Sequence, residues 1–197
     1  MTTKNKLNMA KNSGGTRSRN LSLISDYNSI LKDARSIFTS EAKKGLGENF
    51  MRRQPKEITP EKYNELLNSG DYIEVYHGGS SLSGKYYLSK ELQTNGFGYY
   101  FTPYEQNAMS YADKYGKVYS ALVRKSDIYQ FNGNEERNLR NKGLNDVLKG
   151  KKISEDYKKD YYNRTTVAAR NGHKAVKSYG QDIIIIDRSI LITRKNG

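Results

Sequence analysis

Hydrophobic residues recur at helical spacing near the start of the chain, between residues 21 and 45. Steps of three and four residues separate these positions, and charged or small polar residues mostly fill the other side. The apolar positions are Ile24, Tyr27, Leu31, Ala34 and Phe38. The pattern predicts an amphipathic helix that docks on the domain behind it or on a partner helix. Residues 44–57 contain glycines, a proline and several charges, which favours a linker.

A shorter helix and a strand follow this linker. Thr59 is placed to cap the helix, Pro60 to fill its first position and Gly70 to follow its last turn. The next residues, DYIEVYHGG at 71–79, predict a strand that runs into a tight glycine turn.

Two further strands are expected in the middle of the chain. The polar segment 80–95 indicates a loop around a short strand at 86–88. GFGYYFT at 96–102 indicates a strand opened by two glycines. KVYSALVR at 117–124 alternates, which is typical of a half-buried strand.

A second capped helix is expected between those two strands. Thr102, Pro103 and Glu105 form a capping-box pattern, and the helix is expected to end near Gly116. Residues 132–165 are highly charged and contain few large apolar groups, which predicts a long surface excursion with one or two weak helices.

The last apolar runs, DIIIID at 182–187 and ILIT at 190–193, are rich in β-branched residues and predict central strands. The sequence therefore predicts a mixed α+β fold. We expect three parts: a disordered basic arm at 1–20, an amphipathic helix and linker at 21–57, and one domain at 58–197.

Composition narrows the chemistry. The 197 residues include no cysteine and two histidines, so neither a thiolate nucleophile nor a Cys- or His-rich metal site is expected. The mean hydropathy of −0.90 describes a polar chain. No run is long and apolar enough for a membrane span, and the N-terminus lacks a secretory signal pattern. These features favour a cytosolic protein, or one packaged in a virion and delivered to a host cytosol.

The net charge is strongly positive, at +13. Five of the basic residues lie within residues 1–20, which contain no acid: Lys4, Lys6, Lys11, Arg17 and Arg19. Such a segment either anchors the protein on nucleic acid or is a solvated terminus. The charge favours contact with a polyanion, and it also suits a dinucleotide substrate that carries a diphosphate.

Five residues along the chain match the requirements for cleaving NAD at its glycosidic bond. Nicotinamide is held as a flat cation between aromatic faces, and a glycine backbone can approach its carboxamide. A polar side chain must hold the ribose, and an acid must stabilise the oxocarbenium-like sugar. His77, Gly78, Tyr100, Tyr111 and Asp182 supply these types in order.

With these residues in place, the chain resembles the His-Tyr-Glu branch of the ADP-ribosyltransferase superfamily, which includes diphtheria-toxin-like and poly(ADP-ribose)-polymerase-like domains. It is most similar to the small versions in phage and mobile-element proteins. The His-Gly pair is His77–Gly78, and the Gly-x-Gly-aromatic-Tyr-Phe strand is residues 96–101. Ala108 and Tyr111 follow the signature tyrosine by eight and eleven residues. The last acid stands five residues before Asp187.

The resemblance covers about residues 72–192 and implies a split mixed β-sheet core with a helical N-terminal extension. It implies that His77 holds ribose hydroxyls and that the Gly78–Gly79 backbone pairs with the carboxamide. It also implies that Tyr100 and Tyr111 enclose the nicotinamide, beside Ala108. NAD is then a co-substrate, no metal is needed, and Ser80 and Ser81 contact the adenine-side ribose.

The chain departs from the family at the acid. Asp182 stands in the glutamate position, preceded by Gln181, and a register shift of one residue would exchange the two. Within the family, loss of the glutamate goes with single rather than repeated ADP-ribose transfer, or with inactivity.

Two functions therefore stand side by side. The first is NAD-dependent mono-ADP-ribosyl transfer to a host protein or nucleic acid, as in a phage or toxin-type effector. The second is an inactive protein of the same fold that binds nucleic acid or belongs to a virion. Each candidate residue also has a purely structural interpretation. A histidine after a strand, such as His77, is often only a hydrogen-bonded structural residue. His173 lies in a polar stretch that is typical of a surface.

Overall fold

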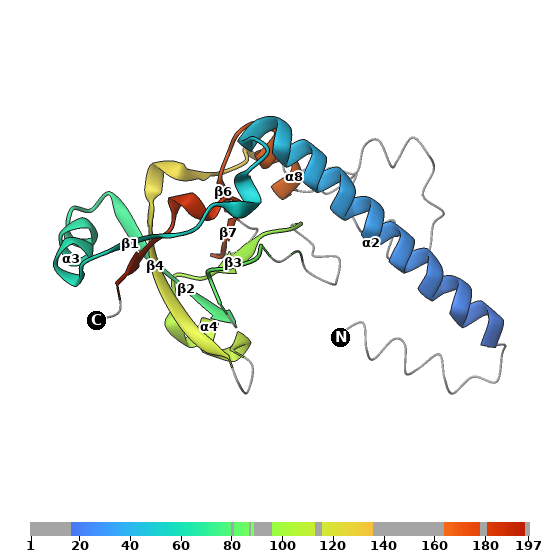
Figure 1. Ribbon diagram of the computed structural model, residues 1–197, viewed down its shortest axis with the longest axis horizontal. Helices are drawn as coiled ribbons and strands as arrows, with labels where there is room; N and C mark the ends of the chain where they lie inside the picture. Colours follow the sequence, from blue (N-terminus) through green and yellow to red (C-terminus); the bar gives the residue numbers. More distant parts are fainter. Residues whose placement is uncertain are drawn as a thin grey trace.

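The computed structural model describes residues 17–79, 81–86, 88, 96–112, 116–135, 164–177 and 181–195, with the backbone alone for 17–27 and 30. These segments form an α+β fold with two mixed sheets of four strands each, as the sequence predicts at that level. Along the chain, helices stand between several of the strands, and the long N-terminal helix runs away from the two sheets (Figure 1).

The first sheet has the strand order β1-β8-β4-β2. Its strands are β1 (Lys56–Ile58), β8 (Ile192–Arg194), β4 (Lys117–Arg124) and β2 (Tyr72–Gly79). β1 pairs parallel with β8, and the other neighbours are antiparallel. The long β2–β4 ladder runs from Tyr72 opposite Arg124 to Gly79 opposite Lys117, which confirms both predicted strands.

The second sheet has the strand order β3-β7-β6-β5. Its strands are β3 (Tyr99–Phe101), β7 (Ile183–Ile185), β6 (Ala175–Lys177) and β5 (Ile128–Tyr129). β7 is central, as its run of isoleucines predicts, and all three of its residues are buried. β8 is likewise central in the first sheet, since it lies between β1 and β4.

A single backbone bridge joins the two sheets within the described chain, between Tyr76 of β2 and Thr102 just after β3. Each residue donates its N–H to the carbonyl of the other, at 2.8 and 2.9 Å. Beyond this bridge β2 and β3 belong to different sheets, so the strands part and leave space between them.

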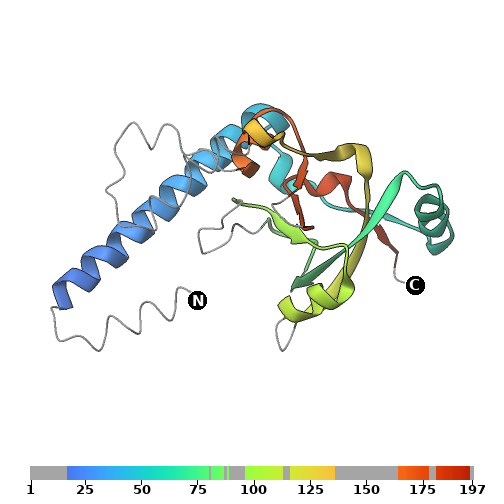
Figure 2. The same cartoon turned by 180° about the vertical axis from the view of Figure 1, so that it is seen from behind.

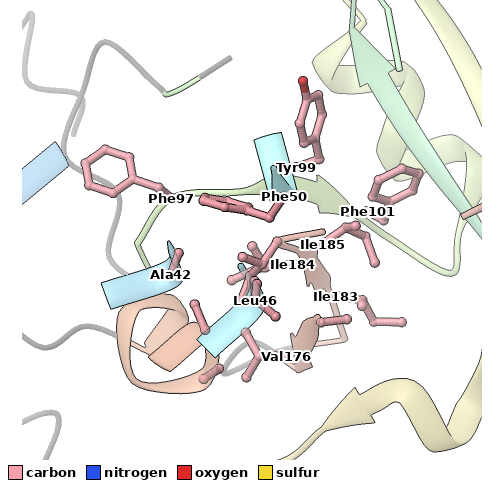
Figure 3. Packing of buried hydrophobic residues seen from close by; sticks show 14 of the residues in the cluster. Ala42, Leu46, Phe50, Phe97, Tyr99, Phe101, Val176, Ile183, Ile184 and Ile185 are labelled. Carbon is pink, nitrogen blue, oxygen red and sulfur yellow. The ribbon is translucent and has the colours of Figure 1, made fainter. Parts of the chain in front are cut away.

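The main core lies where helix α2 (Arg17–Leu46) and helix α8 (Arg164–Arg170) cover the second sheet (Figures 1 and 2). Leu31, Ala34 and Phe38 are buried, as their spacing predicts. The ring of Phe38 lies 5.4 Å from that of Phe97 and 6.3 Å from that of Phe50. Figure 3 shows Phe50 and Phe97 above the isoleucines of β7. The C-terminal half of α2 is thus part of the domain.

The N-terminal half of α2 extends past the rest of the described chain (Figures 1 and 2). The helix begins at Arg17, so it includes the last four residues of the expected disordered arm, which is a correction for those four. Residues 1–16 lie outside the described residues.

The expected linker at 44–57 is more ordered than its composition indicates. Phe50 begins the short 3-10 helix η1 (Phe50–Arg52) and is fully buried, and the last linker residues begin strand β1. The glycines have packing roles here. A side chain on Gly45 would collide with the carbonyls of Ala169 and Arg170, so this glycine lets α2 approach the end of α8.

Helix α3 (Pro60–Asn68) confirms its predicted cap. The Thr59 hydroxyl accepts the N–H of Lys62, Pro60 takes the first position and Gly70 follows at φ +81°. Helix α4 (Glu105–Tyr111) is shorter than predicted. Its N-cap is Tyr104, whose side chain forms no capping bond, so the expected capping box is wrong.

Other short elements were not predicted. Conversely, the short strand expected at 86–88 is wrong for the two residues described there: Tyr86 and Leu88 are in no strand, and Tyr86 is buried in the core as part of a loop. Helix α8 and strands β1, β5 and β6 are too short for a strong periodic pattern. Residues 136–163, which hold most of the expected charged excursion, lie outside the described residues.

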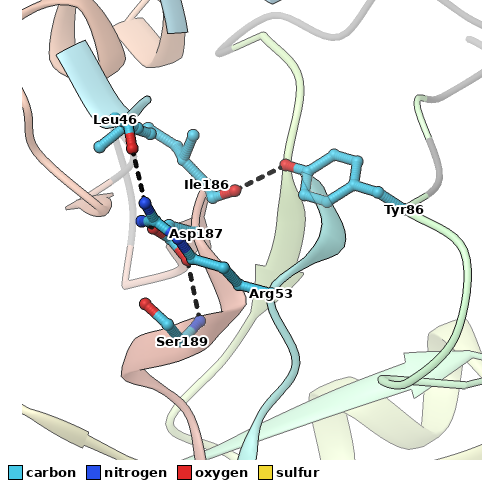
Figure 4. Close-up of polar contacts among 6 residues, drawn as sticks. All are labelled: Leu46, Arg53, Tyr86, Ile186, Asp187 and Ser189. Carbon is cyan, nitrogen blue, oxygen red and sulfur yellow. Dashed lines mark hydrogen bonds and ion pairs between the residues drawn. The ribbon is translucent and has the colours of Figure 1, made fainter. Parts of the chain in front are cut away.

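An ion pair just after β7 fastens the segment that follows α2 to the second sheet (Figure 4). The carboxylate of Asp187 is fully buried, forms an ion pair with Arg53 and accepts the N–H of Ser189 at 3.0 Å. Arg53 also donates to the carbonyl of Leu46 at 2.8 Å. The end of α2 is therefore held by hydrogen bonds as well as by its apolar face.

Replacing Phe38 by alanine tests whether α2 is part of the fold. We expect the free energy of unfolding to fall by about 3–5 kcal/mol, because a fully buried aromatic ring is lost. Urea denaturation followed by circular dichroism measures this change. The exposed Ser40→Ala on the same helix is the matched control. A loss of less than about 0.5 kcal/mol for Phe38→Ala would mean that α2 does not pack here.

Candidate functional site

A cavity of about 700 Å³ opens where β2 and β3 part. It is lined from β2 by His77, Gly78 and Gly79. Later segments contribute Tyr100, Ala108, Tyr111 and Asp182. The structure therefore brings together eight of the ten site residues that the sequence predicts, since Ser81 lines the cavity as well. Gln181 is exposed and does not line this cavity, and Ser80 lies outside the described residues.

His77 is fixed in one orientation by its neighbours. Its ring lies 5.9 Å from that of Tyr99 and 5.2 Å from that of Phe101. Nδ1 is 2.8 Å from the carbonyl oxygen of Tyr100. Because a carbonyl can only accept, Nδ1 carries the proton and the neutral ring keeps Nε2 as an acceptor. Burial lowers the pKa of His77 below its usual value, and the bond to Tyr100 offsets only part of that shift.

The backbone of Gly78 faces the opening between the sheets. Tyr76 directs both of its backbone hydrogen bonds to Thr102, away from β4. Backbone groups two residues apart in a strand point the same way, so the N–H and C=O of Gly78 point beyond the bridge. A ligand with a planar amide could pair with both groups.

Gly78 also lets α4 approach. A Cβ on this residue would collide with the carbonyl of Ala108 and lie 2.6 Å from the backbone nitrogen of Ala112. Ala108 itself is buried, so the contact is close on both sides. Gly79 leaves room for the ring of His77, since a Cβ at this position would lie 2.5 Å from Nε2 of that histidine.

Two tyrosines supply aromatic surface to the cavity. Tyr100 of β3 is partly buried, and its hydroxyl donates to the carbonyl of Gly96 at 2.9 Å, which fixes the ring. Tyr111 ends α4 and is 73% exposed, an unusual fraction for a large aromatic side chain. Its position on the cavity wall makes its ring available to a flat ligand.

Asp182 stands immediately before β7. The register pairs Tyr100 with Ile184 and Phe101 with Ile183, so Asp182 lies one position further, alongside Thr102 and the bridge. Its side chain is partly exposed and lines the cavity, whereas that of Gln181 does not. Of the two residues that the sequence offered for the acid position, the geometry favours Asp182.

Several lining residues were missed by the sequence reasoning. Ser83 and Lys85 belong to the polar loop after β2, and Tyr76 and Thr102 form the bridge. Ser81, which was predicted, lines the cavity as well. A signal for the loop existed, because Leu82 and Tyr86 alternate with these polar residues in the sequence. His173 stacks on Tyr129 at 3.9 Å and does not line the cavity.

Comparisons with known proteins add no relative: no family model, no curated protein and no solved structure matches the chain. Among the described residues, no group of three or more His, Asp or Glu side chains is arranged to hold a metal ion. None of the described helices combines the length and the hydrophobicity needed to cross a membrane.

Replacing Gly78 by alanine tests the close packing of β2 on α4. We expect the protein to lose about 1–3 kcal/mol of stability, because the new methyl group forces the helix backbone away. Chemical denaturation measures the loss. Gly133→Ala is the matched control, since nothing lies within 4 Å of the added Cβ. Equal stability of the two variants would contradict the packing.

A pH titration tests the state of His77. In a His173→Gln variant the remaining histidine is His77, and we expect its NMR titration midpoint to lie below 6.5 because the ring is buried. The unfolded chain then binds more protons than the folded one just below that pH. Stability should therefore fall as the pH falls through about 6.5 and level off below the folded pKa. A midpoint at or above 6.5 would contradict the neutral, acceptor form.

Proposed function

We propose that the protein binds NAD in this cavity and transfers a single ADP-ribose to a protein or nucleic-acid acceptor. The observation that carries the proposal is the convergence of His77, Gly78, Tyr100, Tyr111 and Asp182 on one cavity. These residues span more than a hundred positions of the chain, and the sequence predicts each of them for this chemistry.

The dimensions and polarity of the cavity suit this ligand. Its volume lies within the roughly 300–1,000 Å³ that is common for cofactor sites. Nε2 of His77 can accept a hydrogen bond from a ribose hydroxyl. The N–H and C=O of Gly78 match the two groups of the nicotinamide carboxamide. Tyr100 and Tyr111 offer ring faces to the pyridinium, which gains from stacking and cation–π attraction.

The reaction requires a negative group beside the sugar. The bond between ribose C1′ and the pyridinium nitrogen breaks, its electron pair stays on that nitrogen, and neutral nicotinamide leaves. Positive charge develops on C1′ and the ring oxygen, and the Asp182 carboxylate stabilises it. An acceptor nucleophile then bonds to C1′ and releases its proton to solvent or to a nearby base.

Aspartate makes this site more open than a glutamate would. Its carboxylate reaches one methylene less far from β7, so more room remains between the acid and the ribose. Its partial exposure allows it to accept a hydrogen bond from the ribose 2′-hydroxyl directly or through water. The shorter acid is consistent with one transfer per acceptor rather than chain elongation.

The charge of the protein bears on the acceptor. A net charge of +13 favours a polyanionic target, either nucleic acid or an acidic protein surface. This preference concerns encounter and binding, and it adds nothing to the chemistry at C1′.

Asp182→Asn tests the proposed reaction. We expect kcat for nicotinamide release from NAD to fall about 100-fold or more, because the carboxylate stabilises charge present only in the transition state. The neighbouring Gln181→Ala is the matched control and should leave kcat unchanged, since that side chain lies outside the cavity. Transfer of labelled ADP-ribose in a lysate, with and without nuclease, then identifies the class of acceptor.

One result would favour the second function. If the folded wild type releases no nicotinamide and transfers no label, yet binds nucleic acid with a steep salt dependence, the protein is an inactive binding protein of this architecture. The positive charge is the observation that supports this alternative.

A further inference from the structure

The loop Ser81–Tyr86 forms one edge of the cavity and alternates in character. Leu82 and Tyr86 are buried in the core. Ser81, Ser83 and Lys85 are each next to one of these two residues in the sequence, are exposed and line the cavity. The loop thus directs its apolar residues inward and a row of polar side chains toward the ligand space.

A buried arginine holds this loop from behind. Arg188 is fully buried, and its guanidinium donates to the carbonyls of Leu82 and Gly84, both at 2.9 Å. The guanidinium also lies 5.5 Å from the ring centroid of Tyr86. Gly84 is held a second time by the Gln54 amide, which accepts its N–H at 3.0 Å and donates to its carbonyl at 3.1 Å.

The loop has a positively charged group on each side, the Arg188 guanidinium behind it and the Lys85 ammonium toward the cavity. The partners that the structure gives to the Arg188 guanidinium are carbonyls and aromatic rings, so within the described chain no carboxylate neutralises it. Lys85 stands on the cavity side and forms no ion pair with any described residue. Among the lining residues described, Lys85 is the sole lysine or arginine and Asp182 the sole carboxylate.

This distribution of charge complements a dinucleotide. Its pyridinium end is positive and its diphosphate is negative, so the two ends require opposite charges in the protein. Asp182, just before β7, suits the first, and Lys85 with the Ser83 hydroxyl suits the second, because ammonium and hydroxyl groups are ordinary phosphate partners. The Ser81 hydroxyl hydrogen-bonds the backbone of Ser83 and lies 3.3 Å from the Ser83 hydroxyl, so it orients Ser83. On binding, a phosphate oxygen would replace Ser81 as the acceptor of the Ser83 hydroxyl proton.

We propose that the loop Ser81–Tyr86 is the diphosphate-binding edge of the cavity. In this arrangement Lys85 and Ser83 contact the phosphates, and Arg188 and Gln54 are positioning residues that fix the loop. The inference rests on the proposed function for the identity of the ligand as a dinucleotide, while the preference for a diphosphate is testable by itself.

Binding of ADP and of adenosine by calorimetry separates the phosphate contribution. We expect the wild type to bind ADP more tightly than adenosine. Lys85→Gln should lower the affinity for ADP about tenfold, because one charged hydrogen bond is removed, and leave the affinity for adenosine unchanged. Lys62→Gln is the matched control, since Lys62 is exposed on α3 and pairs with Glu65. With NAD, Lys85→Gln should raise KM by a similar factor and leave kcat unchanged.

A double variant tests the positioning role. Gln54→Ala removes an exposed anchor and leaves the buried Arg188 in place, so the protein should remain folded. It should raise KM for NAD without changing kcat. If Gln54 acts by positioning Lys85, the KM of the Gln54→Ala/Lys85→Gln double variant should equal that of Lys85→Gln alone. Independent effects would instead multiply.

The outcomes separate this inference from the proposed reaction. Unchanged ADP affinity in Lys85→Gln, while wild type still cleaves NAD, overturns the diphosphate edge and leaves the reaction standing. ADP binding through Lys85 without nicotinamide release supports the edge and opposes the reaction. If neither ADP nor NAD binds wild type, both are overturned. If Lys85→Gln weakens the binding of a short oligonucleotide but not that of ADP, the lysine contacts a nucleic-acid acceptor and the inference fails.

Discussion

The site depends on one backbone bridge. Tyr76 and Thr102 exchange both of their hydrogen bonds, and within the described chain they are the point at which the two sheets pair. Beyond this bridge β2 stays paired with β4 and β3 with β7, so the two strands diverge. His77 and Gly78 follow Tyr76 directly, and Asp182 lies alongside Thr102. The same pair of hydrogen bonds therefore sets where the cavity opens and which backbone groups face it.

The end of β7 connects this site to the rest of the molecule. Asp182 precedes the strand, three buried isoleucines form it, and Asp187 and Arg188 follow closely. Asp187 binds Arg53 and so holds the segment after α2, while Arg188 holds the loop that borders the cavity. A short strand thus carries the candidate acid at one end and two buried charges at the other. Burying those charges is costly unless they are paired or hydrogen-bonded, and here each contact also fixes a functional segment.

The glycines near the site have different tasks that composition alone does not reveal. Gly78 makes room for the backbone of α4, and Gly79 makes room for the ring of His77. The backbone of Gly78 is at the same time directed into the cavity. A packing requirement and the proposed binding role therefore coincide at one residue, Gly78.

Sequence alone determined the elements whose signals lie in neighbouring residues. These are the Thr59 cap, the long strands β2 and β4 and the apolar face of α2 from Leu31 to Phe38, together with the types of side chain at the candidate site. Tertiary structure decided the rest. The strands β1, β5 and β6 have two or three residues each and exist only because a partner strand pairs with them. The choice of Asp182 over Gln181 depends on the register of β7 against β3, and the loop that carries Lys85 is held by a buried arginine a hundred residues away. Pairing and burial between distant segments are not encoded in the spacing of nearby residues, so the sequence supplied the chemistry of the site and the fold alone supplied its geometry.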